Sequence, residues 1–392
     1  MTKAERNTLA AAVFVSAALC AAVAAPAATA DLQEALACLD AGKLQEAESI
    51  ALALASAQSS RRPRAWLVVA TARQRQQRYE QAIEAYKQFL PSCDSTELRA
   101  YVLEQISDCR SRLELPKTPA APDQQFTPAE LQQLSIVDRI TYVESTEHFV
   151  IRARNAALAK LLGGKAETAL ARICRELLGG QAFPHTVTIY VWPDREQYLA
   201  NAPGTAPEWS DGSFSVSYKD GLAVRRIDLT QIDDDGRFAT IMIERILPHE
   251  MCHLVLKEFF GDMPCPIAVN EGLAMLAEGR IDNSRIILAG KALVGKAKIP
   301  LEKLLVTDPA EAASKENFYA ESFSFMEYLH SRLTRKQFGA FIDQVKSGCT
   351  VAEAIQRALY LPNDESFLPA LAAAWEEQTV SDCQMLQALG AD

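Results

Sequence analysis

The segment 249–253 has the sequence His-Glu-Met-Cys-His, which combines side chains used in metal-assisted hydrolysis. On a helix, residues four apart share a face, so His249 and His253 can bind one metal ion through their imidazole nitrogens. Glu250 follows the first histidine, and its carboxylate can contact a water molecule activated by the metal. Eighteen positions after His253, Glu271 can supply a third ligand from a second helix. Three nitrogen or oxygen ligands with one open position are typical of a catalytic zinc site, because structural sites are closed by four ligands.

Two features of the sequence favour a metal site over a helix that carries these residues by chance. The chain has only five histidines, and two of them fall within this motif. Residues 241, 243, 246 and 247 before the motif and residues 254–256 after it are all Ile, Leu or Val. Such flanks indicate a buried helix and not a solvent-exposed one.

The HExxH motif at 249–253, followed by the NExxA segment at 270–274, resembles the gluzincin metallopeptidases of the thermolysin-like clan, and especially their peptidase MA-like members. The resemblance extends over residues 138–378. It implies that Glu250 is the general base and that the zinc ligands are His249, His253 and Glu271. A metzincin is excluded, because that group needs a histidine or aspartate six positions after the second histidine, where this chain has Phe259.

The resemblance to the gluzincins leaves open the roles of three residues near the third ligand. Thermolysin-type enzymes orient a histidine with an aspartate four residues after the third ligand, and here that position is Met275. Asn270, next to Glu271, is a candidate for a supporting role or for the N-cap of a helix. Glu278 lies two helical turns past Glu271 and is a competing ligand, although the NExxA match favours Glu271.

Residues 319–329 are rich in Tyr, Ser and Phe and predict a further helix. Peptidase MA-like proteins carry a similar helix packed under the site. By this resemblance, Tyr319 is a second catalytic residue that donates a hydrogen bond to the oxyanion of the reaction. The alternative is that Tyr319 fills core, which is the role expected of Phe323 and Phe325.

The elements that must position these residues are predicted from hydrophobic periodicity. Residues 148–154 and 186–192 alternate as strands, residues 156–178 form an amphipathic helix, and residues 213–217 form a hairpin with 222–229. Together with the resemblance, these elements predict an α+β fold. It consists of a zincin-like catalytic domain, with a mixed sheet and active-site helices, preceded by an all-α region.

Two local features of the catalytic domain, predicted at 135–378, bear on the site. Proline costs a hydrogen bond inside a helix, so the motif helix either begins near Pro248 or kinks there. The strand at 224–229 comes directly before the motif helix. It is either an edge strand that pairs with an extended substrate or an ordinary sheet edge.

Residues 31–115 are helical and weakly repetitive. The sequence at 42–47 matches that at 77–82 with an offset of 35, close to the period of about 34 residues in tetratricopeptide repeats, which this region resembles. The helices form either a surface for a protein partner or a cap packed on the catalytic domain. Prolines mark a linker at 116–134, and residues 379–392 are left as a C-terminal tail.

The N-terminus has the features of a secretory signal peptide over residues 1–30. Lys3 and Arg6 form a positive n-region, residues 9–25 are apolar, and small residues precede a cleavage point after Ala30. The alternative, an uncleaved anchor, is disfavoured because the apolar run is shorter than the ~20 residues that a span needs. No other transmembrane segment is predicted, so the mature chain is expected to be periplasmic or secreted.

Charge and cysteine content narrow the function further. The formal net charge of −10 argues against nucleic acid as a partner. Eight cysteines remain without the signal peptide and none forms a CxxC pair, so a thiolate zinc site is not predicted and disulfide pairing stays open.

The sequence predicts an exported zinc-dependent metallopeptidase that hydrolyses peptide or protein substrates, with Zn2+ as cofactor. The alternative is a catalytically inactive peptidase-like protein that binds or scaffolds a partner through its helical repeats.

Overall fold

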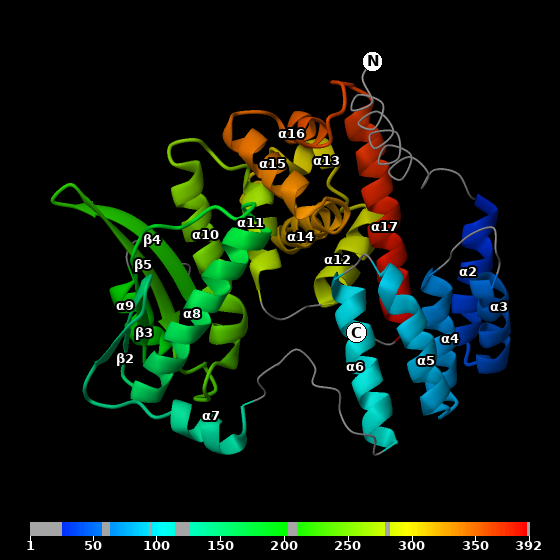
Figure 1. Cartoon of the computed structure of the whole chain (residues 1–392), viewed down its shortest axis with the longest axis horizontal. Coiled ribbons are helices and arrows are strands. Elements are labelled where there is room, and N and C mark those ends of the chain that lie inside the picture. The colour runs from blue at the N-terminus through cyan, green and yellow to red at the C-terminus, as the bar shows by residue number, and fades with distance from the viewer. Residues whose placement is uncertain are drawn as a thin grey trace, which may run out of the picture.

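The computed structural model describes residues 26–56, 63–93, 96–113, 126–202, 210–278 and 283–389, and residues 1–25 of the predicted signal peptide lie outside this set. Figure 1 shows a sheet on one side of the molecule and the N-terminal helices on the other, with further helices between them. The predicted α+β fold is confirmed, because an all-helical region precedes a domain with a mixed sheet. Among the described residues, no helix is both long enough and apolar enough to span a membrane.

The sheet has five strands in the order β1-β2-β3-β5-β4. The central strands β2 (Phe149–Ala153), β3 (Val187–Trp192) and β5 (Leu222–Thr230) run parallel to one another. The two edge strands, β1 (Tyr142–Ser145) and β4 (Gly212–Lys219), are antiparallel to their neighbours. All four predicted strands are confirmed to within one or two residues, and β1 is an addition to them.

The prediction that the strand at 224–229 lies at the sheet edge is wrong. This segment belongs to β5, which pairs with β3 through a parallel ladder from Thr188↔Arg226 to Trp192↔Thr230. Its other side is covered by β4, so the hairpin places β4 at the edge. β4 also lies against α10 (Leu247–Phe260), the helix that carries the HExxH motif.

The helices α8 (Ala156–Glu176) and α10 pack on the sheet and contribute with it to the main hydrophobic core, which also includes side chains of the helices that follow along the chain. The side chain of Asn155 caps α8 by accepting a hydrogen bond from the Leu158 N–H. The same side chain donates to the carbonyl oxygen of Gln133 at 2.8 Å. This bond holds α7 (Pro128–Leu134) beside α8, so the last part of the predicted linker is an ordered helix.

The helix that carries the HExxH motif continues directly from a single turn of π-helix. η3 (Met242–Ile246) is a π-helix, and α10 begins directly after it with Pro248 in its first turn. Proline lacks the N–H of a regular helix interior, and the irregular π turn directly before it accommodates the missing hydrogen bond. The regular α-helix begins at Leu247, next to Pro248, but it continues irregular helical turns that start at residue 240, so the structure combines features of both alternatives; His249 and His253 lie on the regular part. π turns within helices are frequent at functional sites.

α11 (Ile267–Ala277), which carries the predicted third ligand, lies closely against α14 (Lys315–Arg332). A Cβ atom at Gly272 would lie 2.4 Å from Cγ of Met326 and 2.7 Å from the carbonyl oxygen of Ser322. Carbon atoms do not approach other heavy atoms so closely in folded proteins. A side chain at position 272 therefore requires α11 and α14 to move apart.

The C-terminal half is mainly helical. The helix predicted at 319–329 is confirmed as part of α14, which begins earlier because Ser314 caps it. The remaining helices of the sheet domain and the C-terminal half are α9 (Arg195–Asn201), α12 (Asn283–Val294), α13 (Leu301–Leu304), α15 (Arg335–Lys346), α16 (Val351–Ala358) and α17 (Phe367–Leu389). Residues 379–389 of the predicted tail continue α17, which packs on α12.

The N-terminal region consists of successive helices, each packed against the next along the chain. They are α2 (Pro26–Asp40), α3 (Leu44–Ser56), α4 (Pro63–Arg75), α5 (Tyr79–Phe89), the short 3-10 helix η2 (Leu90–Ser92) and α6 (Thr96–Arg112). Their buried side chains form one hydrophobic core with residues of α12 and α17, which we call the shared core. Figure 1 shows α17 beside these helices.

Polar contacts join the same elements. Arg64 of α4 pairs with Asp382 of α17. Arg75 of α4 donates to the carbonyl oxygen of Ala388 at 2.8 Å, in the last turn of α17, where helix carbonyls lack partners within the helix. The N-terminal helices are thus packed on the chain's own C-terminal helix, as the cap interpretation predicts. A partner protein at these helices stays a prediction.

Candidate metal centre

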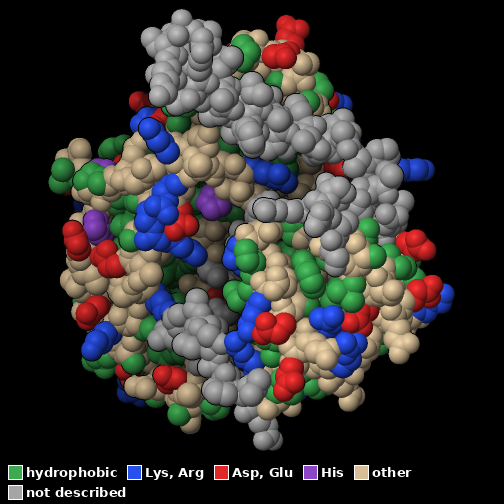
Figure 2. Space-filling model, turned by 45° about the vertical axis from the view of Figure 1, so that its right-hand side comes forward, with side chains coloured by type: hydrophobic (Ala, Val, Ile, Leu, Met, Phe, Trp, Pro, Cys, Tyr) green, Lys and Arg blue, Asp and Glu red, His purple; other side chains and the backbone are tan. Residues whose placement is uncertain are grey.

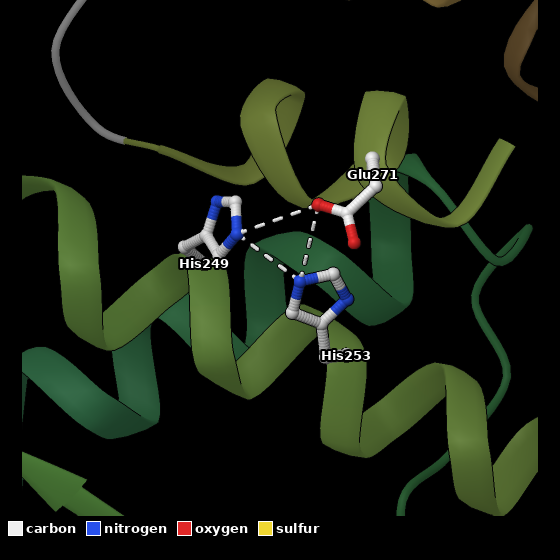
Figure 3. A group of neighbouring side chains, drawn as sticks. All are labelled: His249, His253 and Glu271. Carbon is white, nitrogen blue, oxygen red and sulfur yellow. Dashed lines mark hydrogen bonds and ion pairs between the residues drawn. The ribbon is translucent and has the colours of Figure 1, made fainter. Parts of the chain in front are cut away.

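His249 and His253 lie one turn apart on α10, and Glu271 of α11 faces them (Figure 3). The Nε2 atoms of the two histidines are 3.1 Å apart. Oε2 of Glu271 lies 3.9 Å from Nε2 of His249 and 3.6 Å from Nε2 of His253. The structure thus brings together the three predicted metal ligands. Within the described part of the chain, they form the one group of His, Cys, Asp and Glu side chains with ligand atoms this close together.

The far nitrogen of each imidazole has a partner of its own. Nδ1 of His249 contacts Oε1 of Glu278 at 3.0 Å, and Nδ1 of His253 contacts the amide oxygen of Asn270. Both partners are acceptors, so each Nδ1 carries a proton and donates it. Each Nε2 then presents its lone pair toward the other. Two lone pairs at this distance require a cation between them, which is a proton or a metal ion.

The pKa values of the two histidines agree with this picture. Burial acts to lower the pKa of His249, but the hydrogen bond with Glu278 and the charge of Glu250 raise it above its usual range. Burial and the charge of His249 lower the pKa of His253 to about 3. One proton shared by the pair satisfies both nitrogens, and a metal ion that displaces it gains two neutral imidazole ligands.

The spacing and chemistry of the three ligands fit zinc. Zinc forms bonds of about 2.0–2.2 Å to imidazole nitrogen and carboxylate oxygen, so a tetrahedral site separates its ligand atoms by about 3.4 Å. The separations of 3.1, 3.6 and 3.9 Å lie around this value. Two imidazoles and one carboxylate leave a fourth position for water or substrate, as a catalytic site requires.

Glu250 lies beside the edge strand β4. The backbone N–H of Phe214 in β4 is directed toward its carboxylate and acts to lower the pKa of that group. The strand comes so close that a Cβ atom at Gly212 would lie 3.4 Å from Cγ of Glu250 and 2.2 Å from Cγ2 of Ile246. Burial, in spite of the charge of His249, raises the pKa of Glu250 to about 7. A carboxylate with this pKa can accept a proton and return it near neutral pH.

A family model described as the peptidase MA superfamily matches residues 165–367, which is more than half of the chain's 392 residues. The chain belongs to the peptidase MA superfamily. The matched range includes every residue of the site described above, so the domain that holds the site is peptidase-like. Searches of curated proteins and of solved structures found no match.

In this peptidase MA domain, Glu278 takes the supporting role that the sequence left open. Its carboxylate lies on the Nδ1 side of His249, away from the converging ligand atoms. Arg245 donates to its Oε2 at 2.8 Å, and Arg285 contacts both of its oxygens. Burial acts to raise its pKa, but the bond with His249 and the charge of Arg285 hold the pKa below its usual range. Glu278 therefore stays ionised and orients His249, and it lies outside the group of three side chains whose ligand atoms converge.

In the same peptidase MA domain, Asn270 orients His253, the second histidine of the HExxH motif. α11 has its N-cap at Pro266, so Asn270 lies inside the helix and its alternative role as an N-cap is wrong. Its amide oxygen accepts the hydrogen bond from His253 instead. Met275, which stands where thermolysin-type enzymes have aspartate, is buried in the shared core. An unpaired carboxylate at that position would be costly.

Tyr319 lies on α14 and is partly buried, with its ring edge-on to Phe318 at 5.7 Å between centroids. Burial and then the charge of Glu271 raise the pKa of its hydroxyl. The phenol is thus within electrostatic range of a metal ligand and stays protonated at neutral pH, as a hydrogen-bond donor must. Its catalytic role stays a prediction. Phe323 and Phe325 are buried, as expected.

The described residues hold three further histidines and eight cysteines besides the residues of the metal centre. Each remaining histidine contacts a residue elsewhere: His148 pairs with Glu167, His185 with Glu258, and His330 packs against Phe338. All eight cysteines of the described residues are free. Cys252, inside the HExxH motif, is fully buried in the main core, which confirms that it serves packing there.

Proposed function

We propose that this chain is an exported zinc-dependent metallopeptidase. The observation that carries the proposal is the convergence of Nε2 of His249, Nε2 of His253 and Oε2 of Glu271 while both Nδ1 atoms are engaged by other acceptors. Membership of the peptidase MA superfamily supports the peptide bond as the target. Export rests on the signal-peptide pattern with its cleavage point after Ala30.

The residues around the ligands are suited to hydrolysis. Zinc at this site would lower the pKa of a water molecule from 15.7 to about 7 and polarise the substrate carbonyl. Glu250 is placed to take the proton of the attacking water and to pass that proton to the leaving nitrogen. Glu278 and Asn270 keep the two histidines in the tautomer that leaves Nε2 free. Tyr319 is the proposed donor to the oxyanion.

The edge strand β4 offers a place for an extended substrate. An edge strand has backbone N–H and C=O groups without a partner in the sheet, and a peptide can pair with them. Because the N–H of Phe214 reaches Glu250, the open side of β4 faces the general base. We therefore propose that a substrate segment binds along β4 in an extended conformation. This mode requires a flexible peptide or an unfolded part of a protein.

The alternative function is that of an inactive peptidase-like protein that binds or scaffolds a partner through its helical repeats. Two observations favour the enzyme. The ligands and the general base are all present and lie together. The N-terminal helices bury side chains against α12 and α17, which reduces the surface left for a partner.

Metal analysis and peptide hydrolysis of the mature protein test the proposal. We expect about one zinc per chain, and its loss in His253→Ala and Glu271→Ala. Glu250→Gln should keep zinc but lower kcat/KM in a peptide-library digest by about 10²-fold or more, because the base is lost while the shape is kept. His148→Ala is a matched control, since His148 also pairs with a carboxylate but lies outside the site.

Each component of the proposal has an outcome that rejects it. Unchanged zinc content in Glu271→Ala would reject the third ligand. Wild-type hydrolysis by Glu250→Gln would reject the base. A wild-type protein that holds zinc and cleaves no peptide, but binds a partner through the N-terminal helices, would favour the scaffold function.

A further inference from the structure

Arg285 connects the metal centre to a separate part of the molecule. It lies in the first turn of α12, and its side chain is 18% exposed. Its Nη2 donates to Oε1 of Glu278 at 3.1 Å, and its Nη1 lies 3.0 Å from Oε2 of the same carboxylate. Oε1 is also the oxygen that accepts the hydrogen bond from Nδ1 of His249. Arg285 thus contacts the atom that orients a metal ligand.

The contact of Arg285 with Glu278 differs from that of Arg245. Arg245 donates its Nε to Oε2, and it belongs to the turn η3 that runs directly into α10. Arg285 reaches both oxygens from a different helix. A guanidinium that contacts both oxygens of a carboxylate fixes the plane of that carboxylate, which a single contact does not. The plane of Glu278 in turn sets the direction in which the His249 ring faces.

The position of Arg285 depends on the shared core. Its neighbours Ile286 and Ile287 are buried there together with side chains of the N-terminal helices. Its guanidinium lies 5.7 Å from the ring centroid of Phe323, which belongs to the same core. α12 also crosses α17 tightly, because a Cβ atom at Gly290 would lie 2.2 Å from Cβ of Cys383.

We propose that Arg285 is a positioning residue that sets the metal affinity by holding Glu278 against His249, and that the N-terminal helices support the metal centre through it. The inference rests on the proposed function, because it concerns the same metal site. Without Arg285, a buried carboxylate loses two of its contacts, and the histidine loses a fixed partner. Loss of outer partners of metal-binding histidines typically costs about 10–100-fold in affinity.

Zinc affinity and stability, measured separately on the full mature chain, test the inference. Competition with a chromophoric chelator gives the zinc Kd, and thermal unfolding of the metal-free protein gives the stability. Arg285→Met keeps the apolar stem and removes the guanidinium, and we expect a zinc Kd about tenfold weaker or more. Arg285→Lys keeps the charge without the planar two-point contact, so it should recover only part of the loss.

Arg225→Met is the matched control. Arg225 of β5 contacts both oxygens of Glu258 on α10, at 2.8 and 2.9 Å, and its side chain is 13% exposed. Its removal breaks a similar ion pair, on the helix that carries His249 and His253, but does not reach the metal ligands. We expect Arg225→Met to lower the stability of the metal-free protein and leave the zinc Kd unchanged.

Gly290→Ala tests the link to the shared core, because it alters the contact of α12 with α17 and leaves Glu278 and Arg285 chemically intact. We expect a zinc Kd weakened several-fold, and an unchanged Kd would overturn this link.

An unchanged or tighter Kd in Arg285→Met overturns the positioning role, while peptide hydrolysis by the wild type leaves the proposed function standing. If Arg285→Met does not fold, Arg285→Lys decides, since a wild-type Kd in that variant overturns the role. A wild-type protein without zinc affinity overturns both proposals.

Discussion

Replacement of Gly272 by alanine tests how closely α11 must lie on α14 to place Glu271. The added methyl carbon would lie 2.4 Å from Cγ and 2.9 Å from Cβ of Met326, and 2.7 Å from the carbonyl oxygen of Ser322. Met326 is fully buried and the carbonyl belongs to the backbone, so neither can move at low cost. We expect α11 to move away from α14 by roughly 0.5–1 Å, which restores ordinary van der Waals contact.

Two opposing effects set the stability of Gly272→Ala. Alanine is favoured over glycine inside a helix by about 1 kcal/mol. Overpacking of a core costs about 1–3 kcal/mol, and a clash with backbone belongs at the upper end of that range. We expect the free energy of unfolding to fall by about 1–2 kcal/mol. Glu271 moves with the helix, and metal sites tolerate deviations of only about 0.2 Å in ligand distances, so zinc affinity should fall by about tenfold or more.

Thermal unfolding of the metal-free protein and chelator competition measure these two effects. Gly164→Ala is the control, because Gly164 lies in α8 and a Cβ atom there meets nothing within 4 Å. That variant should gain up to about 1 kcal/mol and keep its zinc affinity. Wild-type stability and affinity in Gly272→Ala would refute the close contact. Lower stability with wild-type affinity would refute the dependence of Glu271 on that contact.

Two other predictions concern the remainder of the chain. A protein that begins at residue 126 should be insoluble or poor in zinc, because the N-terminal helices complete the shared core. Solubility and zinc content measure this, and a soluble zinc-bound product would contradict it. Glu321 is fully buried, and burial raises its pKa to about 8. In the folded chain the Glu321 carboxyl keeps its proton up to about pH 8, whereas in the unfolded chain it loses the proton above about pH 4.5. The free energy of unfolding should therefore fall from about pH 5 to 8 by up to about 1.4 kcal/mol per pH unit. Glu321→Gln should flatten this decline in urea unfolding at pH 5, 6.5 and 8, and an equal decline in both proteins would assign it to other groups.

Elements with strong periodicity are predictable from the sequence alone. The helix predicted at 156–178 ends two residues earlier in the structure, and β3 alternates buried and half-buried residues from Val187 onward. β1 has only four residues, Tyr142–Ser145, which is too short for an alternating pattern to be evident. The interior position of β5 depends on its parallel pairing with β3, and such long-range pairing leaves no local pattern.

The same distinction separates the metal ligands from their partners. The four-residue spacing of His249 and His253 follows from helix geometry and is therefore visible in the sequence. Glu278 reaches His249 from the end of α11, across the contact between two helices, and no local pattern predicts that contact. Arg245 gave a weak signal, since it lies four residues before His249. Arg285 gave none, because it comes from a helix that the sequence did not predict.

The position of α11 between two cores explains why the N-terminal helices matter for the site. Val269 and Leu273 of α11 are buried in the main core with the sheet, whereas Met275 is buried in the shared core with the N-terminal helices. Glu271 lies on the same short helix, so its position is set by both cores at once. If the N-terminal helices were an independent domain, α10 and α11 would be buried by the catalytic domain alone. Removal of the N-terminal helices takes away part of the core in which Met275 is buried, so we expect the truncation at residue 126 to weaken the support of Glu271.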